Sequence, residues 1–205
     1  MNEEAARVYR FETEGGLARD RRLEVDFEAF GLEAKRWGNA GLEGVAYDAA
    51  TRRLYLAKER QPRFLLEFQL DENHRVTELL SKFDFDPLRR GALDRVLADY
   101  SDLFFEGGFL YVLERRDLLV AKVDVRTKKV VARVDYRVLR PDGEGLYRGS
   151  TLVGMAEALL LTPYEIWIGF DNGRKEINAA NRWAREFQLG GSESAIARFR
   201  RPAGF

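Results

Sequence analysis

The sequence contains no cysteine and a single histidine, His74, among its 205 residues. Without cysteine the chain has no disulfide, no thiolate metal site and no cysteine nucleophile. His74 lies in the polar stretch 71–75, which predicts a turn, and no second histidine is available to bind zinc with it. Catalysis by a histidine-activated nucleophile therefore has little support.

Long apolar runs are also missing, since none approaches the ~20 residues that a membrane-spanning helix needs. The start, Met1-Asn2-Glu3-Glu4, is acidic and has no apolar segment typical of a signal peptide, which fits a cytoplasmic location or export after loss of a leader outside this chain. Thirty-four basic residues balance 34 acidic ones, so no excess charge attracts nucleic acid or an anionic membrane. We expect one domain over residues 1–205, a monomer, with no nucleic-acid partner and no membrane insertion.

The pattern that is present is an alternation of apolar and polar residues, which predicts β-strands. One block of four short strands is predicted at 43–48, 53–58, 63–70 and 76–83, and a second at 101–105, 109–114, 117–125 and 129–136. A third, less regular block has strands at 157–162, 165–170 and 194–200. Four short antiparallel strands per repeat are typical of propeller blades. We predict an all-β fold, a β-propeller of about four to five blades with an incomplete ring as one option, and a β-sandwich as the alternative.

Other segments are less regular. Helical insertions are predicted at 87–97, where Pro87 suits a first turn, and at 177–187, where apolar residues recur at helical spacing. A further hairpin is predicted at 144–153. The strand-like pair at the N-terminus, separated by Gly15-Gly16, could complete the last blade and so close the ring.

An acidic residue opens each block, and these three residues lie 59 and 55 positions apart: Glu43, Asp102 and Glu157. The first strands of successive blades line the central channel, so equivalent residues should converge there. Carboxylates held together need a proton or a cation, and hard oxygen ligands favour Ca²⁺, followed by Mg²⁺ or Mn²⁺. The alternative is that they accept hydrogen bonds from backbone amides of neighbouring blades. Glu144, in a similar Glu-Gly pair, is a fourth candidate ligand or a turn residue.

A second acidic set ends the second strand of each block: Glu59, Glu114 and Asp171. These residues are candidate general bases or ligands of a second ion. Because Arg60 and Arg115 follow the first two directly, ordinary ion pairs between blades are the alternative.

Three segments of the chain carry motifs of a known kind. They contain, in order, Leu42-Glu43-Gly44-Val45-Ala46-Tyr47-Asp48, then Phe109-Leu110-Tyr111-Val112-Leu113-Glu114-Arg115, then Ile166-Trp167-Ile168-Gly169-Phe170-Asp171-Asn172. These motifs resemble those of the SdiA-regulated and esterase-like-phytase β-propellers over about positions 41–175. The resemblance implies a propeller of five or six blades, acidic residues at its axis and calcium in some relatives. It also implies frequent export and an association with phosphoesterase activity.

Two functions follow as hypotheses. One is a non-enzymatic propeller that binds a small-molecule or phosphorylated ligand, or a partner, with a structural Ca²⁺ in its channel. The other is a metal-dependent phosphoesterase in which Glu59 or Glu114 is the base. We favour the first, because the sequence contains no nucleophile constellation.

Overall fold

The computed structural model describes residues 8–14, 17–23, 25–38, 40–60, 62–85, 99–139, 144–149 and 156–205. Within this part, the chain forms 13 β-strands and a few short helices. The all-β class predicted from the alternating pattern is therefore confirmed.

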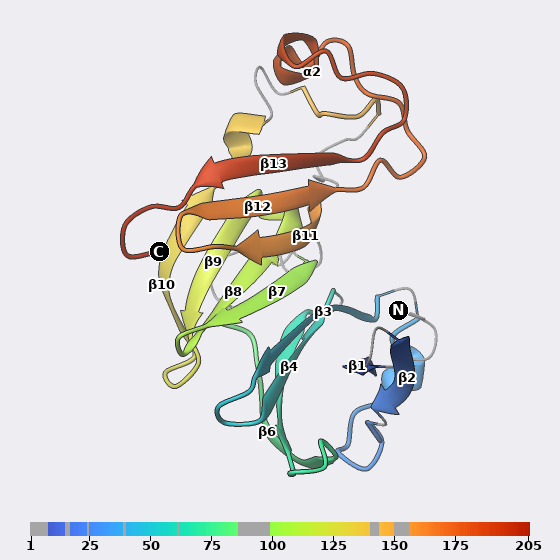
Figure 1. The fold of residues 1–205 in the computed structure, drawn as a ribbon, viewed down its shortest axis with the longest axis vertical. Helices are drawn as coiled ribbons and strands as arrows, with labels where there is room; N and C mark the ends of the chain where they lie inside the picture. Colours follow the sequence, from blue (N-terminus) through green and yellow to red (C-terminus); the bar gives the residue numbers. More distant parts are fainter. Residues whose placement is uncertain are drawn as a thin grey trace.

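Two four-stranded antiparallel sheets form the centre of the fold (Figure 1). The first contains β3 (Leu42–Asp48), β4 (Arg53–Lys58), β5 (Phe64–Leu70) and β6 (Val76–Phe83). The second contains β7 (Asp102–Glu106), β8 (Phe109–Glu114), β9 (Leu119–Asp124) and β10 (Lys129–Asp135). In both sheets the spatial order follows the sequence, which is the connectivity of a propeller blade.

A third sheet has only three strands among the described residues: β11 (Ala156–Leu161), β12 (Glu165–Phe170) and β13 (Ala195–Arg200). The N-terminal strands β1 (Val8–Glu14) and β2 (Leu17–Leu23) form a separate hairpin. The described pairings join β13 to β12 and β1 to β2. The N-terminal pair thus does not complete the last blade in this structure.

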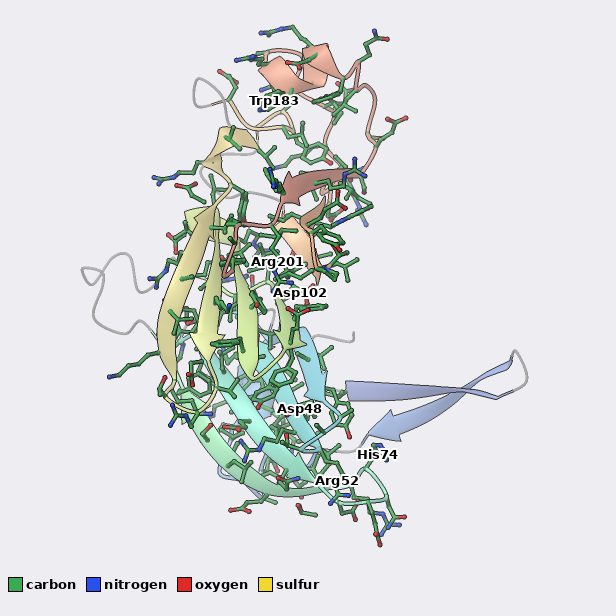
Figure 2. All side chains as sticks on the ribbon, turned by 60° about the vertical axis from the view of Figure 1, so that its left-hand side comes forward. Asp48, Arg52, His74, Asp102, Trp183 and Arg201 are labelled. Atoms are coloured by element: carbon green, nitrogen blue, oxygen red, sulfur yellow. The ribbon has the colours of Figure 1, made fainter. Side chains whose placement is uncertain are left out.

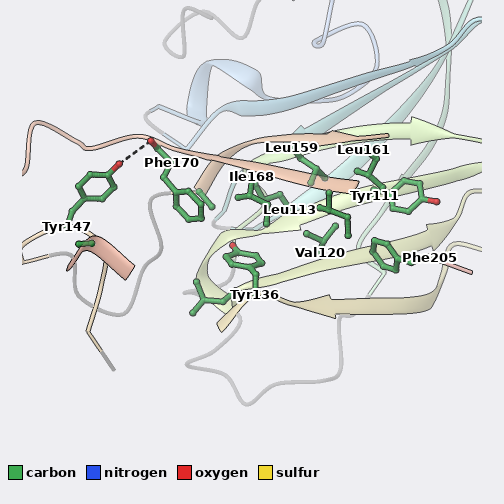
Figure 3. Packing of buried hydrophobic residues seen from close by; sticks show 14 of the residues in the cluster. Tyr111, Leu113, Val120, Tyr136, Tyr147, Leu159, Leu161, Ile168, Phe170 and Phe205 are labelled. Carbon is green, nitrogen blue, oxygen red and sulfur yellow. Dashed lines mark hydrogen bonds between the residues drawn. The ribbon is translucent and has the colours of Figure 1, made fainter. Parts of the chain in front are cut away.

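Apolar side chains on facing strands hold neighbouring sheets together. Figure 3 shows the contact between the second and third sheets, where Tyr111, Leu113 and Val120 meet Leu159 and Ile168. A similar cluster joins the first and second sheets, and includes Ala46, Tyr55, Leu65, Leu103, Leu110 and Val123. Fully burying one leucine or valine contributes roughly 1.5–3 kcal/mol, so these interfaces hold the blades in a fixed relative position.

The outer face of the first sheet is covered by the segment that precedes it. Phe27 and Trp37 from this segment pack edge-on against Phe68 and Phe64, with ring centroids 6.2 Å and 5.8 Å apart. Leu32 is buried in the same cluster. Residues 25–37 therefore act as a cap on the first blade, and we call them the N-terminal cap.

The predicted helix at 177–187 is shorter than expected. Helix α2 spans only Arg182–Glu186, because the side chain of Asn181 caps it by accepting the amides of Trp183 and Ala184 at 3.0 Å and 3.2 Å. Ile177, placed in the helix by its spacing, instead forms an isolated β-bridge with Tyr147. The predicted helix at 87–97 lies wholly within residues 86–98, which are outside the described residues, as are residues 150–153 of the predicted hairpin.

Candidate functional site

The first strands of the three sheets lie side by side. β3 contacts β7, and β7 in turn contacts β11. The approach of β3 to β7 is close at Gly44, where an added Cβ would lie 2.9 Å from the backbone of Asp102 and Leu103. A glycine is needed here because any side chain would overlap the neighbouring strand.

Two of the three acidic openers, Glu43 and Glu157, lie at irregular positions at the start of these strands. The register between β3 and β4 shifts between Leu42 and Gly44, which leaves Glu43 as the extra residue of a β-bulge. The register between β11 and β12 shifts in the same way around Glu157. Bulges redirect a side chain and interrupt pairing, so the first and third blades share one local device at the predicted position.

Asp102, the opener of the second blade, links β7 to β11 through backbone hydrogen bonds (Figure 2 labels it near the junction of the sheets). Its Oδ1 accepts the amide of Leu103 at 2.8 Å, and its Oδ2 accepts the amide of Leu159 at 2.7 Å. Burial raises the pKa of Asp102 to about 6, against the lowering effect of these two hydrogen bonds, and nearby Glu157 raises it further. These contacts match the backbone-bonded alternative for this residue.

Arg115, which opens the 3₁₀ helix η3 (Arg115–Asp117), lies at the centre of a carboxylate cluster. Its guanidinium donates to Glu59 at 2.7 Å, to Asp99 at 2.9 Å and 2.8 Å, and to Glu157. Its side chain is only 12 % exposed. We call Glu59, Asp99, Arg115 and Glu157 the Arg115 network, and it joins residues of all three sheets.

A second buried ion-pair cluster lies beside it. Glu114 is fully buried and pairs with Arg63, from the connection between β4 and β5, at 3.3 Å. Arg63 also lies 4.5 Å from the ring of Tyr100, whose hydroxyl donates to Asp84 at 2.7 Å. Glu59 and Glu114 thus both pair with an arginine of the neighbouring blade, as the ion-pair alternative describes.

The remaining predicted residues lie nearer the surface. Asp171 is exposed just after β12. Burial raises the pKa of Glu157, and the negative charges of Asp99 and Asp171 add to this effect. Glu144 is exposed, and its side-chain oxygen Oε2 accepts a hydrogen bond from the Asn178 side-chain amide at 2.9 Å. Glu43 is half-buried at its bulge. Sequence reasoning missed Asp99 as a member of the cluster, although it lies three residues before the opener Asp102.

The fit of a metal ion can be judged from the oxygens that are still available. Among the described residues, no group of three or more acidic or histidine side chains is arranged to hold a metal. The guanidinium of Arg115 already contacts three of the carboxylates and supplies positive charge there. Glu59 Oε2 is a buried oxygen without a hydrogen-bond partner in the described part. We therefore assign no chemical step to a metal, and Ca²⁺, Mg²⁺ or Mn²⁺ binding stays a prediction.

A groove of about 790 Å³ lies alongside β13. Its walls come from Tyr136 just after β10, from the 3₁₀ helix η4 (Arg137–Leu139), from α2 and from residues 195–199 of β13. Val138, Phe187 and Ile196 line it and are 55 %, 64 % and 69 % exposed. The indole nitrogen of Trp183, labelled in Figure 2, donates to the Val138 carbonyl at 2.7 Å, which satisfies its polar group within an apolar wall. We call this the β13 groove.

A family model described as SdiA-regulated matches residues 1–145. The chain belongs to the SdiA-regulated family. A search of curated protein sequences gave no match. None of the helices in the described ranges has the length and apolar composition to cross a bilayer.

Solved structures similar to this SdiA-regulated chain are β-propellers. A luciferin-regenerating enzyme is 9 % identical with a TM-score of 0.50, over 91 % of this chain and 49 % of that one. BamB from Moraxella catarrhalis is 13 % identical with a TM-score of 0.41, over 68 % and 34 %. A PQQ-bound aldose sugar dehydrogenase from Streptomyces coelicolor is 11 % identical with a TM-score of 0.37, over 77 % and 42 %. The chain spans about half the length of the luciferin-regenerating enzyme and less than half the length of the other two proteins. The likeness to the first of them supports the propeller fold and nothing more.

Proposed function

We propose that this SdiA-regulated chain is a non-enzymatic binding module and that the β13 groove is its binding surface. The observation that carries the proposal is the groove itself, with three large apolar side chains exposed along its walls. Ligand sites are commonly concave, mostly apolar and about 300–1,000 Å³ in volume. Large exposed apolar patches on soluble proteins often mark such sites.

The buried carboxylates support binding over turnover. A general base needs room for the group whose proton it takes, whereas Glu59 and Glu114 are buried and each is paired with an arginine. His74 lies in a tight turn with φ of 60°, and its ring packs against Tyr47 at 6.1 Å. Neither set of contacts favours an activated nucleophile.

The ligand class follows from the lining of the groove. Its apolar walls suit a hydrophobic body. Arg198 at its edge pairs with Glu165 at 3.3 Å, but its side chain is 62 % exposed, so the outer nitrogens of its guanidinium suit an anionic group such as a phosphate. We therefore propose a small molecule with both features, or a partner segment that presents them.

Binding can be measured with anilinonaphthalene sulfonate, an apolar dye that carries one anionic group. We expect saturable binding that falls at least about fivefold in Phe187→Ser, since this change removes an exposed wall of the groove. Tyr164→Ser is the matched control, because Tyr164 is 80 % exposed and lies outside the groove. Equal dye binding by both variants, with unchanged circular dichroism, would rule out the groove as the site.

A Ca²⁺-dependent phosphoesterase is the second candidate. The observation in its favour is Glu59 Oε2, a buried oxygen that no described group hydrogen-bonds, in a carboxylate that shares Arg115 with Asp99 and Glu157. It predicts hydrolysis of para-nitrophenyl phosphate that a chelator abolishes, and loss of both Ca²⁺ binding and turnover in Glu43→Gln. A structural Ca²⁺ alone predicts a melting temperature raised by Ca²⁺, without turnover. A melting temperature unchanged by Ca²⁺ and by chelator would reject both metal hypotheses.

A further inference from the structure

The third sheet ends in an open edge at β13. In the described residues this sheet has three strands where the other two have four, and β13 pairs with β12 alone. The amide of Arg201 donates to the Tyr164 carbonyl at 2.7 Å. Because backbone groups of successive residues point to opposite sides of an antiparallel strand, those of Ile196, Arg198 and Arg200 point to the free edge. Such an edge is a template for another strand.

The β13 groove runs along this same strand, since residues 195–199 all contribute to its lining. In the first two sheets the fourth strand contributes apolar side chains to the packing. Val76 and Leu79 of β6, and Val130 and Val134 of β10, pack against the buried clusters. A strand added to β13 would therefore be expected to combine backbone pairing with apolar side chains, the mode of recognition known as β-augmentation.

The basic residues of β13 indicate what kind of strand could pair with its free edge. Arg198 and Arg200 are exposed on β13, so pairing of one β13 with another would bring like charges together. An acidic strand is favoured instead. The outer strand β6 has one glutamate and one lysine, and β10 has two basic residues and one acidic residue. β1, with two glutamates and one arginine in Val-Tyr-Arg-Phe-Glu-Thr-Glu, carries net negative charge and alternates apolar with charged residues from Tyr9 to Glu12. Its hairpin partner β2, Leu-Ala-Arg-Asp-Arg-Arg-Leu, is basic, so β1 is the acidic edge of the hairpin.

The position of β1 in the fold indicates whether the same chain or a second copy could supply β1 as the strand added to β13. β1 pairs with β2 on one side, and the hairpin extends away from the sheets in Figure 2. Figure 1 places the hairpin in the lower half and β13 in the upper half of the molecule along its long axis. We propose that β1 of a second copy of this chain adds to the free edge of β13, beside the groove. The inference rests on the proposed function, because it names the occupant of that same surface.

The test measures the mass of the full chain by light scattering over a range of concentrations, at low and physiological salt. We expect a concentration-dependent assembly of two or more copies that weakens with salt, because charged residues contribute to the contact. Ile196→Pro should shift the apparent dissociation constant at least about tenfold, since proline removes an edge amide without touching the ladder to β12. Ile196→Thr, which keeps the amide, should assemble like the parent chain.

A second variant tests the partner strand independently of β13. Glu12→Arg combined with Glu14→Arg should also weaken assembly at least about tenfold, because it makes both strands basic. A chain that stays monomeric at every concentration would refute the inference, as would assembly insensitive to Ile196→Pro. Assembly lost in Ile196→Pro but retained by the glutamate variant would refute the assignment to β1. Dye binding by a strictly monomeric chain would leave the proposed function standing while this inference fails.

Discussion

Replacement of Arg115 by methionine tests whether the Arg115 network holds the blades together. The guanidinium is 12 % exposed, while Glu59 and Asp99 are 3 % and 4 % exposed. Removing one partner of a buried ion pair commonly costs about 3–5 kcal/mol, since the other charge is left without compensation. Arg60 remains in contact with Glu59, so we expect a loss near the lower end, about 3 kcal/mol.

The expected change is large enough to measure by urea and thermal unfolding. Domains of about 150–250 residues change their melting temperature by roughly 2–4 °C per kcal/mol, so about 3 kcal/mol corresponds to a fall of roughly 6–12 °C at pH 7. The difference from the parent chain should shrink as the pH falls towards 4, because burial raises the pKa of Glu157 and its protonation removes one of the negative charges that the variant leaves unpaired.

Arg137→Met is the matched control, since Arg137 pairs with Asp135 at the surface and its side chain is 69 % exposed. Surface ion pairs of this kind contribute about 0–1 kcal/mol. Equal losses in the two variants, or a loss in Arg115→Met that does not diminish in acid, would show that the network does not stabilise the fold as we infer.

Two further predictions concern Gly44, where β3 approaches β7, and Asp102 at the start of β7. Gly44→Ala should lower the free energy of unfolding by about 1–3 kcal/mol, because the added methyl group overpacks the contact between the strands. Gly190→Ala should change it little, since an added Cβ at Gly190 meets nothing within 4 Å. Equal effects of the two changes in urea unfolding would contradict the close approach of β3 to β7. The folded-state pKa of Asp102, about 6, lies above its ordinary value of 3.8, so the folded state binds the proton more tightly and stability should fall as the pH rises from about 4 to 6. Asp102→Asn should flatten this part of the pH profile, and an unchanged slope would refute the assignment.

Much of the fold could be predicted from the sequence because strand alternation and turn residues are local signals. The strands of all three blocks lie within two residues of the predicted positions. The helix at 177–187 was predicted too long, since apolar spacing was given more weight than the capping side chain of Asn181. The cap on the first sheet was not predicted, because its packing against Phe64 and Phe68 depends on residues distant in sequence.

The candidate site could be predicted only in part. The repeat correctly indicated that Asp102 and Glu157 start neighbouring inner strands. It could not show that Arg115 contacts Glu59 and Asp99, since a sequence does not reveal which arginine turns inward. The β13 groove was missed altogether, because its walls come from a 3₁₀ turn, a five-residue helix and an edge strand that no short motif connects.

The N-terminal cap has a consequence for modular design. In repeat proteins, terminal units with a finished outer surface keep the array soluble, and units between them depend on their neighbours. Here Phe27, Leu32 and Trp37 cover the outer face of the first sheet. On the last sheet, by contrast, the side chains of Leu160 and Ile196 are 50 % and 69 % exposed. An engineer adding blades would therefore graft them after β13, where the surface is already apolar, and leave the first sheet untouched.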